Sequence, residues 1–561
     1  MKRLLLLLLI SAIALGMGAC HRTDAPDTPD VTAAPTEPAA PDASGRYFLS
    51  DDGEAILTGD EFENAQVPED NYRVFYEIFV SSFSDSDGDG VGDLQGILNR
   101  MDYLNDGDPA SGLSLGVEGL WLSPIFKSQS YHKYDVNDYY EIDPAFGTMD
   151  DLKALLDACH SRNVKVILDL PINHTGRLSQ WFGNFTRAHR EENASDPWYD
   201  FYCYYHEGET APAGRRFARL SGTSDWYECN FSDDMPELNF DSPAVRQAAL
   251  DVAKYYLELG VDGFRFDAAK YIYFGENARS ADFWSWYIAE LKKLDPEIYT
   301  VAEVWDSDGV TDVYYPALNC FNFTTSQTSG LIAETAKKGN VNVYTAYVDH
   351  YLDVIHALNP DAMIVPFIAN HDTDRAAGYL PIASWQMQMA ANLYILSSGS
   401  PFLYYGEELG MRGSRGGANT DANRRLAMLW GDGDTVRNPD GADYDPANQT
   451  ASTVESLKGD GNSLLNYYKR LLLIRSANPE IARGEYTALN VTDSKVGGFV
   501  AVWNGSWVCV LHNTTLTAKT VDLSRLTGEQ FSVIAAVIGQ GGATLDGTLL
   551  TLDSMTSVVL R

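Results

Sequence analysis

Residues 261–269 read Val-Asp-Gly-Phe-Arg-Phe-Asp-Ala-Ala, and the fold follows from this stretch. Its apolar first part, 261–266, has the length of a buried strand, and the strand ends at the charged residue Asp267. Apolar residues recur at helical spacing before it in 245–259 and after it in 281–294. A buried strand between two helices predicts one unit of a parallel α/β fold.

Further runs of the same kind lie along the chain on both sides of this one. They span 74–80, 117–122, 164–168, 298–304, 318–323, 363–368 and 401–405, with more helical patterns at 149–160 and 382–396. Alternating strands and helices fit either an open doubly wound sheet or a closed barrel.

Polar side chains at the ends of these strands distinguish the two folds. They are Asp169, His174, Arg265, Asp267, Glu303, His371, Asp372 and Glu407. Convergence of many strand ends on one centre is typical of a barrel whose active site lies at its C-terminal rim. We therefore predict an α/β fold, namely a (β/α)8 TIM barrel.

The pattern changes within the barrel and after it. We assign the barrel to 68–173 and 237–480, where a helical run at 464–476 should complete the outer ring. The intervening 174–236 lacks a helical period and is too long for an ordinary loop, so we expect a small inserted domain after the third strand. Short alternating strands in 481–561 predict a C-terminal all-β sandwich.

The N-terminal residues have the features of an export signal. Lys2 and Arg3 precede an apolar run and the small residues before Cys20, which predicts a signal peptide over 1–20. Small residues leading into Cys20 resemble a bacterial lipobox, which implies lipidation of Cys20; the alternative is an ordinary signal peptide. Residues 21–67 begin rich in Pro, Ala, Thr and Asp, so we expect a disordered tether. The expected product is an extracytoplasmic lipoprotein that contacts the membrane only through its lipid.

Composition limits the classes of partner. The 561 residues contain 41 Lys plus Arg and 78 Asp plus Glu, a net charge of −37 that repels nucleic acid. We expect a monomer without nucleic-acid partners. The cysteines after Cys20 are odd in number, and only Cys203 and Cys229 share a loop-rich region where a disulfide could form.

Residues 85–93 alternate carboxylates with glycines, a composition that suits Ca²⁺. The predicted ligands of this structural ion are Asp85, Asp87, Asp89, Val91 and Asp93. An EF-hand is excluded because Gly96 stands where its loop needs a glutamate. A solvated acidic turn is the alternative.

Three acidic strand ends carry the predicted chemistry. Arg265 and Asp267 share one face of a strand, so the arginine can keep the carboxylate ionised as a nucleophile. Glu303 ends an apolar strand, where burial would raise its pKa and suit it to acid/base work. Asp372 adds a third carboxylate beside His371. Such a group fits a glycosidase, and no Ser or Cys occupies a nucleophile elbow.

Four segments, 169–174, 263–270, 302–304 and 367–372, resemble in order the signature regions of the α-amylase family, glycoside hydrolase family 13. The resemblance spans about 70–480, and 235–239 is similar to the group between oligo-1,6-glucosidases and neopullulanases. It implies an α-amylase that cleaves internal α-1,4-glucosidic bonds of starch-like α-glucans with retention. Exo-α-glucosidases, cyclomaltodextrinase or neopullulanase types, transglycosylases and a non-catalytic glucan-binding protein are the alternatives.

The resemblance also implies residue roles. Asp267 would be the nucleophile, Glu303 the general acid/base and Asp372 the carboxylate that stabilises the transition state. The implied substrate-binding residues are His132, Tyr134, Asp135, His174, Arg265, Lys270, His371 and Arg375. Lys133 departs from the family's pattern, because a glycine is usual before the platform residue Tyr134.

Overall fold

The computed structural model describes residues 46–59, 64–381, 385–417 and 420–561. The predicted signal peptide, Cys20 and the first part of the predicted tether lie outside these residues. None of the described helices combines the length and apolar character that a membrane span needs.

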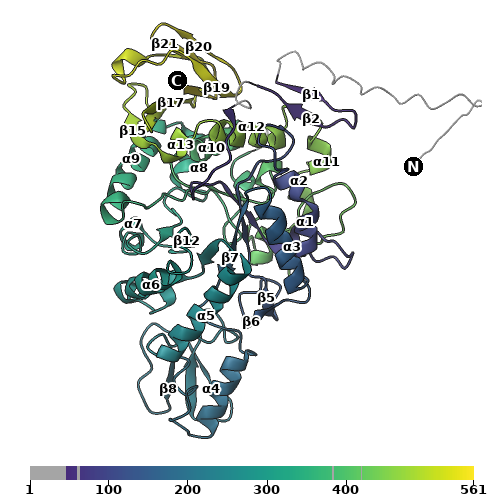
Figure 1. Ribbon diagram of the computed structural model, residues 1–561, viewed down its shortest axis with the longest axis vertical. Helices are drawn as coiled ribbons and strands as arrows, with labels where there is room; N and C mark the ends of the chain where they lie inside the picture. Colours follow the sequence, from purple (N-terminus) through teal and green to yellow (C-terminus); the bar gives the residue numbers. More distant parts are fainter. Residues whose placement is uncertain (1–45, 60–63, 382–384, 418–419) are drawn as a thin grey trace, which may run out of the picture. The chain divides into compact units, whose positions relative to one another are not determined.

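A parallel sheet forms the centre of the molecule (Figure 1). Its strands, in spatial order, are β13 (Asn319–Cys320), β12 (Tyr299–Ala302), β11 (Gly263–Phe266), β7 (Lys165–Leu170), β4 (Gly119–Leu122), β3 (Phe75–Ile78) and β14 (Phe402–Tyr404). Single parallel bridges from Phe321 to Val365 and from Phe367 to Phe402 join the two edges through 363–368. The sheet therefore closes into the predicted TIM barrel, in which the seventh predicted strand contributes bridges rather than a continuous ladder.

The barrel interior is filled by side chains rather than open. Large apolar residues from successive strands form one buried cluster that includes Phe75, Trp121, Ile167, Tyr299, Val301, Phe321, Val365, Phe367 and Phe402. This packing is typical of barrels with an active site at one rim, because the closed interior leaves only the strand ends open to a substrate.

Helices surround the sheet. They include α1 (Leu94–Asn99), α2 (Met101–Leu104), α3 (Met149–His160), α5 (Pro243–Leu259), α6 (Asn277–Leu291), α7 (Asp308–Thr311), α8 (Leu331–Lys338), α9 (Val341–Leu358), α10 (Gln386–Ile395), α11 (Val454–Leu457), α12 (Leu464–Ser476) and α13 (Glu480–Arg483). Thr148 and Asp151 form a capping box that starts α3, and Gly260, at φ 104°, ends α5. The predicted bounds of α3 and α12 agree with the structure.

The segment after β7 contains a helix that the sequence pattern did not indicate. Helix α4 (Gln180–Arg190) is followed by the antiparallel strands β8 (Tyr204–His206), β9 (Phe217–Arg219) and β10 (Asp225–Glu228), in the order β8-β10-β9. Ser179 caps α4, and the helix buries Phe182 and Phe185.

A separate antiparallel pair precedes this segment. Strands β5 (Phe126–Ser128) and β6 (Val136–Ile142) enclose the turn 129–135, which carries several predicted site residues.

The C-terminal residues form two antiparallel sheets. One contains β15 (Glu485–Leu489), β16 (Val496–Trp503), β17 (Ser506–Asn513), β22 (Thr556–Leu560) and β19 (Ile534–Gly539); the other contains β18 (Lys519–Asp522), β21 (Leu549–Leu552) and β20 (Ala543–Asp546). Val500, Leu511 and Val558 of the first share a buried cluster with Leu550 and Leu552 of the second. The predicted all-β sandwich is confirmed.

The tether predicted as far as residue 67 is corrected at its end. Strands β1 (Tyr47–Leu49) and β2 (Ala55–Leu57) form a hairpin, and the N–H of Ala55 donates to the carbonyl of Lys458 at 2.9 Å. Leu57 is 3% exposed. Apolar residues replace the Pro- and Ala-rich composition from Tyr47 onward, which supplies the burial that an ordered segment needs.

The possible disulfide is also corrected. Cys203 and Cys229 are both free thiols in the structure. Their side chains face different partners, since the Cys203 thiol donates to the carbonyl of Leu238 and the Cys229 thiol lies 3.8 Å from a carboxylate oxygen of Asp233.

Candidate active site

A cavity of about 650 Å³ opens at the carboxyl ends of the barrel strands. Its lining residues come from the turn 129–135, the inserted segment, and the loops after β11, β12, the bridging segment 363–368 and β14. They are Tyr131, His132, Tyr134, His174, Phe231, Ser232, Met235, Asp267, Ala268, Lys270, Tyr271, Glu303, Trp305, Asp372, Thr420, Asp421 and Arg425. The three predicted catalytic carboxylates all lie in this wall.

The buried side chain of Arg265 holds the carboxylates in place through hydrogen bonds. Its fully buried guanidinium donates from Nη1 to Oδ1 of Asp267 at 2.6 Å and from Nη2 to Oε2 of Glu303 at 2.9 Å. Nη1 also donates to Asp169 at 2.8 Å. One guanidinium therefore holds two predicted catalytic groups on the same side of the cavity. The sequence spacing predicted its contact with Asp267 but not the one with Glu303.

The turn after β11 is strained. Ala268 has φ 45° and ψ 41°, a left-handed conformation that costs a non-glycine residue energy. This conformation aims its N–H at Oε2 of Glu303, at 3.0 Å. The strain is thus accompanied by a second hydrogen bond that orients Glu303.

Burial sets the proton affinity of the two carboxyl groups. Desolvation raises the pKa of Asp267 to about 6, against the opposing charge of Arg265. Desolvation likewise raises the pKa of Glu303 to about 7, again opposed by Arg265. Glu303 therefore binds its proton more tightly than Asp267, which is the order that a general acid and a nucleophile need.

The pKa of Asp372 is lowered, in contrast to the raised pKa values of Asp267 and Glu303. Burial alone would raise its pKa, but the charges of His371 and Arg425 hold it well below its usual value. His371 Nε2 lies 2.9 Å from Asp372 Oδ2, and Arg425 donates to Oδ1 at 2.6 Å. Asp372 is an anion with both oxygens bound, so it does not compete with Glu303 for a proton.

Two neutral histidines and a tyrosine complete the predicted sugar-binding wall. Burial lowers the pKa of both His132 and His174 to about 4. His132 Nδ1 accepts the N–H of Tyr134 at 3.1 Å, which leaves Nε2 as its donor. The Tyr134 ring stacks near His371, with centroids 5.6 Å apart and planes at 15°. Lys133 has φ 64°, which explains why a glycine is usual at this position.

Four predicted substrate-binding residues lie outside the cavity wall: Arg265 and His371, which contact the catalytic carboxylates, and Asp135 and Arg375. Asp135 accepts hydrogen bonds from the hydroxyls of Ser128 and Ser130, and so shapes the turn. Arg375 is 2% exposed and donates to the carbonyls of Arg424 and Tyr405. In the structure the side chains of Asp135 and Arg375 bind neighbouring groups of the protein, and their contacts with a substrate stay a prediction.

Arg425 is a site residue that sequence reasoning missed. It contacts Asp372 and also donates to the hydroxyl of Tyr131 at 3.0 Å. It comes from an irregular loop after the last strand, and no strand end or motif marks it. Of the two arginines on this side of the site, the cavity wall contains Arg425 rather than Arg375.

Another part of the cavity wall contains a lysine and exposed aromatic side chains. Lys270 donates to the carbonyl of Trp305 at 2.8 Å and to Asp306 at 3.0 Å. Trp305 is 38% exposed and stacks on Phe323, while Phe231 is 43% exposed beside Tyr271. Exposed rings in a cavity offer flat apolar surfaces, which pack against the apolar faces of pyranose rings.

The predicted calcium loop brings together three of its five expected ligands. Carboxylate oxygens of Asp85, Asp87 and Asp89 lie within 4.8 Å of one another. Asp93 instead caps α1, with Oδ1 accepting the N–H of Gly96 at 2.6 Å. Hard oxygen donors fit Ca²⁺, and a cation among three close carboxylates would relieve their repulsion. Val91 is not a member of this side-chain group, and only its carbonyl oxygen could bind a metal.

Comparison with known proteins gives consistent matches. A family model described as alpha amylase, catalytic domain, matches residues 77–484. Alpha-amylase 3 of Dictyoglomus thermophilum is 33% identical over 462 residues, 80% of this chain and 86% of that protein. The 4-alpha-glucanotransferase of Thermotoga maritima is 32% identical over 358 residues, 62% and 74% of the two chains. The solved structure of Eubacterium rectale Amy13B has a TM-score of 0.81 and 33% identity, covering 88% of this chain and 96% of that one.

Proposed function

The chain belongs to the α-amylase family of glycoside hydrolases, and from this premise we propose that it is an endo-acting α-amylase that hydrolyses α-1,4-glucosidic bonds of starch-like glucans with retention. The observation that carries the proposal is the pair Asp267 and Glu303, held by one guanidinium and differing in proton affinity. A shared guanidinium keeps the two groups close, which supports the retaining geometry, with carboxyls about 5–5.5 Å apart.

The proposed reaction has two steps. Asp267 attacks the anomeric carbon while Glu303 donates its proton to the leaving glycosidic oxygen, so a glycosyl ester forms as the glycosidic bond breaks. Glu303, now ionised, removes a proton from water, and the water oxygen displaces Asp267 from the anomeric carbon. Asp372 stabilises the positive charge that develops on the sugar in both steps.

A transglycosylase is the second candidate. It is favoured by the similarity to a 4-alpha-glucanotransferase and by the exposed rings of Phe231 and Trp305 in the cavity wall. A sugar held on these rings could replace water in the second step. Hydrolysis and transfer differ only in which hydroxyl Glu303 activates.

We further propose that the loop 85–93 binds a structural Ca²⁺. Asp85, Asp87 and Asp89 would hold the ion, with the carbonyl of Val91 as a further ligand. The ion would neutralise the clustered negative charge and thereby stabilise the loop.

The proposed location is extracytoplasmic, with lipidation at Cys20. The charged start, the apolar run and the small residues before Cys20 support this proposal. Cys20→Ala should move the protein from the membrane fraction to the soluble fraction of its native host. Retention of the variant in membranes would contradict a lipid anchor.

Product analysis tests the activity. The chain from residue 21 is incubated with soluble starch and, separately, with pullulan, beside Asp267→Asn. Mixed maltooligosaccharides released early from starch, and absent with the variant, would support endo-hydrolysis. Longer glucans formed from short maltooligosaccharides would favour the transferase, and glucose alone would indicate an exo-glucosidase.

A further inference from the structure

Glu77 in β3 is a buried carboxylate that the mechanism above does not use. It is 1% exposed, and its Oε1 lies 2.5 Å from Nδ1 of His371. Among the described residues it forms no ion pair with a lysine or arginine. A buried carboxylate without such a partner is costly unless a nearby group carries a compensating positive charge.

The hydrogen bonds of His371 show that the imidazole supplies this charge. Nδ1 faces Glu77, and Nε2 lies 2.6 Å from the Tyr134 hydroxyl and 2.9 Å from Asp372 Oδ2. The Tyr134 hydroxyl donates its own hydrogen to Asp169 at 2.8 Å, so its oxygen accepts from Nε2. Both ring nitrogens thus face acceptors, and only the imidazolium has a hydrogen on each.

The other groups around His371 have opposing effects. Arg425 donates to the His371 carbonyl at 3.1 Å, and its charge disfavours a second cation, whereas the nearby charge of Asp169 favours one. Burial also acts to lower the pKa of His371, but Asp372 and Glu77 outweigh it and raise that pKa to about 10. Asp372 lies on the side of the His371 ring that faces the cavity. Glu77 is therefore the carboxylate that stabilises the imidazolium from the side of the ring away from the cavity.

We propose that Glu77 is a positioning residue for the reaction: through Nδ1 it keeps His371 an imidazolium, and this cation holds Asp372 ionised and oriented against the sugar. The chain Glu77–His371–Asp372 alternates negative, positive and negative charge across the strand ends. The inference rests on the proposed function, because Asp372 is there the carboxylate that stabilises the transition state.

Glu77→Gln separates charge from hydrogen bonding. The glutamine amide has the same shape and can donate to Nδ1, so a neutral His371 still points Nε2–H at Asp372. A purely structural role for Glu77 predicts little change in this variant. The charge role predicts that His371 loses its proton at a lower pH, and that Asp372 then loses its cationic partner.

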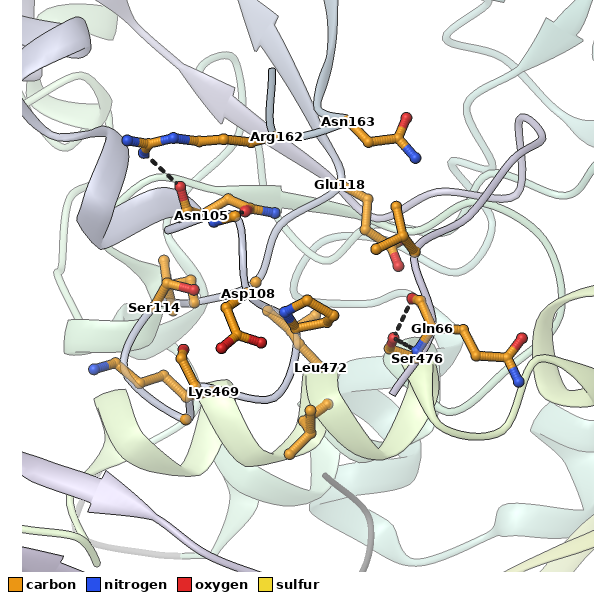
Figure 2. A pocket seen from close by; sticks show the side chains of 18 of the residues that line it. Gln66, Asn105, Asp108, Ser114, Glu118, Arg162, Asn163, Lys469, Leu472 and Ser476 are labelled. Atoms are coloured by element: carbon orange, nitrogen blue, oxygen red, sulfur yellow. Dashed lines mark hydrogen bonds between the residues drawn. The ribbon is translucent and has the colours of Figure 1, made fainter. Parts of the chain in front are cut away.

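Glu118→Gln is the matched control. Glu118 is also a hydrogen-bonded glutamate at a barrel strand, but it is only partly buried and precedes β4 at the opposite end of the barrel, where its Oε2 accepts the N–H of Val74 at 2.8 Å. Figure 2 shows Glu118 in the wall of a small separate pocket with Asn163 and Gln66. Glu77→Asp, which retains the charge on a shorter side chain, tests rescue.

The first readout is the ¹⁵N NMR signal of His371 in histidine-labelled protein, assigned with His371→Gln and followed from about pH 5 to pH 9. We expect both nitrogens protonated throughout in the wild type and in Glu118→Gln, and a titration within this range in Glu77→Gln. This measurement needs no substrate, so it separates failure of the inference from failure of the proposed function.

The second readout is the pH dependence of kcat on maltooligosaccharides. Glu77→Gln should lower kcat by roughly 10- to 100-fold, the equivalent of one charged hydrogen bond, with a loss that grows as the pH rises and with KM little changed. Glu77→Asp should recover part of this loss. A neutral His371 in the wild type at pH 7, or an imidazolium that persists in Glu77→Gln, would overturn the proposal, and so would an unchanged kcat profile in an active enzyme.

Discussion

Asp267 and Glu303 need opposite protonation states when the reaction starts. Asp267 must be an anion to attack, and Glu303 must carry the proton that it gives to the leaving oxygen. Burial raises the pKa of the first to about 6 and of the second to about 7. Only within a narrow pH range does a large fraction of the molecules have Asp267 ionised and Glu303 protonated at the same time.

This pH range predicts a bell-shaped pH dependence of kcat/KM. Activity should rise with an apparent pKa of about 6, as Asp267 ionises, and fall with one of about 7, as Glu303 ionises. Initial rates on a maltooligosaccharide between about pH 4 and pH 9 measure both limbs. In Glu303→Gln the alkaline limb should disappear together with most of the activity. An acidic limb near the ordinary carboxyl range, about pH 4, would contradict the role of desolvation.

Among the individual site residues, the sequence predicted those that lie near one another along a strand or at its end. The Arg265–Asp267 pair follows from alternation along β11, and Glu303 from its position after an apolar run. Arg425 and Glu77 were not predicted, because their contacts with Asp372 and His371 join segments far apart in the chain. Arg375, a predicted substrate-binding residue, is buried beside Tyr405 and is not part of the cavity wall.

Elements around the barrel rim place the remaining parts of the site. The loop before α1 carries the three clustered carboxylates, and Gly90, at φ 97°, lets it curl beside Arg437. Acidic spacing predicted this cluster, but it did not reveal that Asp93 is the N-cap of α1.

Calcium should stabilise the folded chain through this loop. With free Ca²⁺ at about 100 times its dissociation constant, the gain is about 2.7 kcal/mol, so a chelator should lower the melting temperature. Asp87→Asn should reduce this response, whereas Asp150→Asn, at a carboxylate whose side chain is 92% exposed, should retain it. Equal melting temperatures with calcium and with chelator would contradict the site.

Helix α4 supports the inserted segment that contributes Phe231 and Met235 to the cavity. Phe185→Ala should destabilise the fold by about 3–5 kcal/mol, because this ring is fully buried against Phe182 and Tyr202. Leu178→Ala, at a side chain 61% exposed, should change stability by less than about 0.5 kcal/mol. Urea unfolding measures both. Similar values for the two variants would show that α4 does not anchor the segment.

For the whole molecule, the apolar pattern predicted the alternating strands and helices, and the polar strand ends were needed to choose between an open sheet and a barrel. Strand ends rich in polar groups indicated the barrel, and alternation indicated the C-terminal sandwich. The strand predicted at 363–368 contributes only bridges in the structure. The hairpin β1–β2 was not predicted, because its short strands contain too few residues for a period. The hairpin depends on contacts with residues some 400 positions away, such as that of Ala55 with Lys458.

Removal of the hairpin should therefore cost stability. A chain that begins at residue 46 should melt at the same temperature as one that begins at residue 21. A chain that begins at residue 68 loses the burial of Leu57, a contribution of about 1.5–3 kcal/mol, and should melt lower. Calorimetry on the three chains checks this expectation, and equal melting of all three would show that the hairpin is dispensable.

Retaining hydrolysis of α-1,4-glucans by Asp267 and Glu303 determines the anomeric form of the first product. Proton NMR of a fresh digest of maltooligosaccharides resolves the α and β anomers before mutarotation mixes them. We expect that the α anomer appears first and that Asp267→Asn releases none. Initial formation of the β anomer, or undiminished release by the variant, would contradict this mechanism.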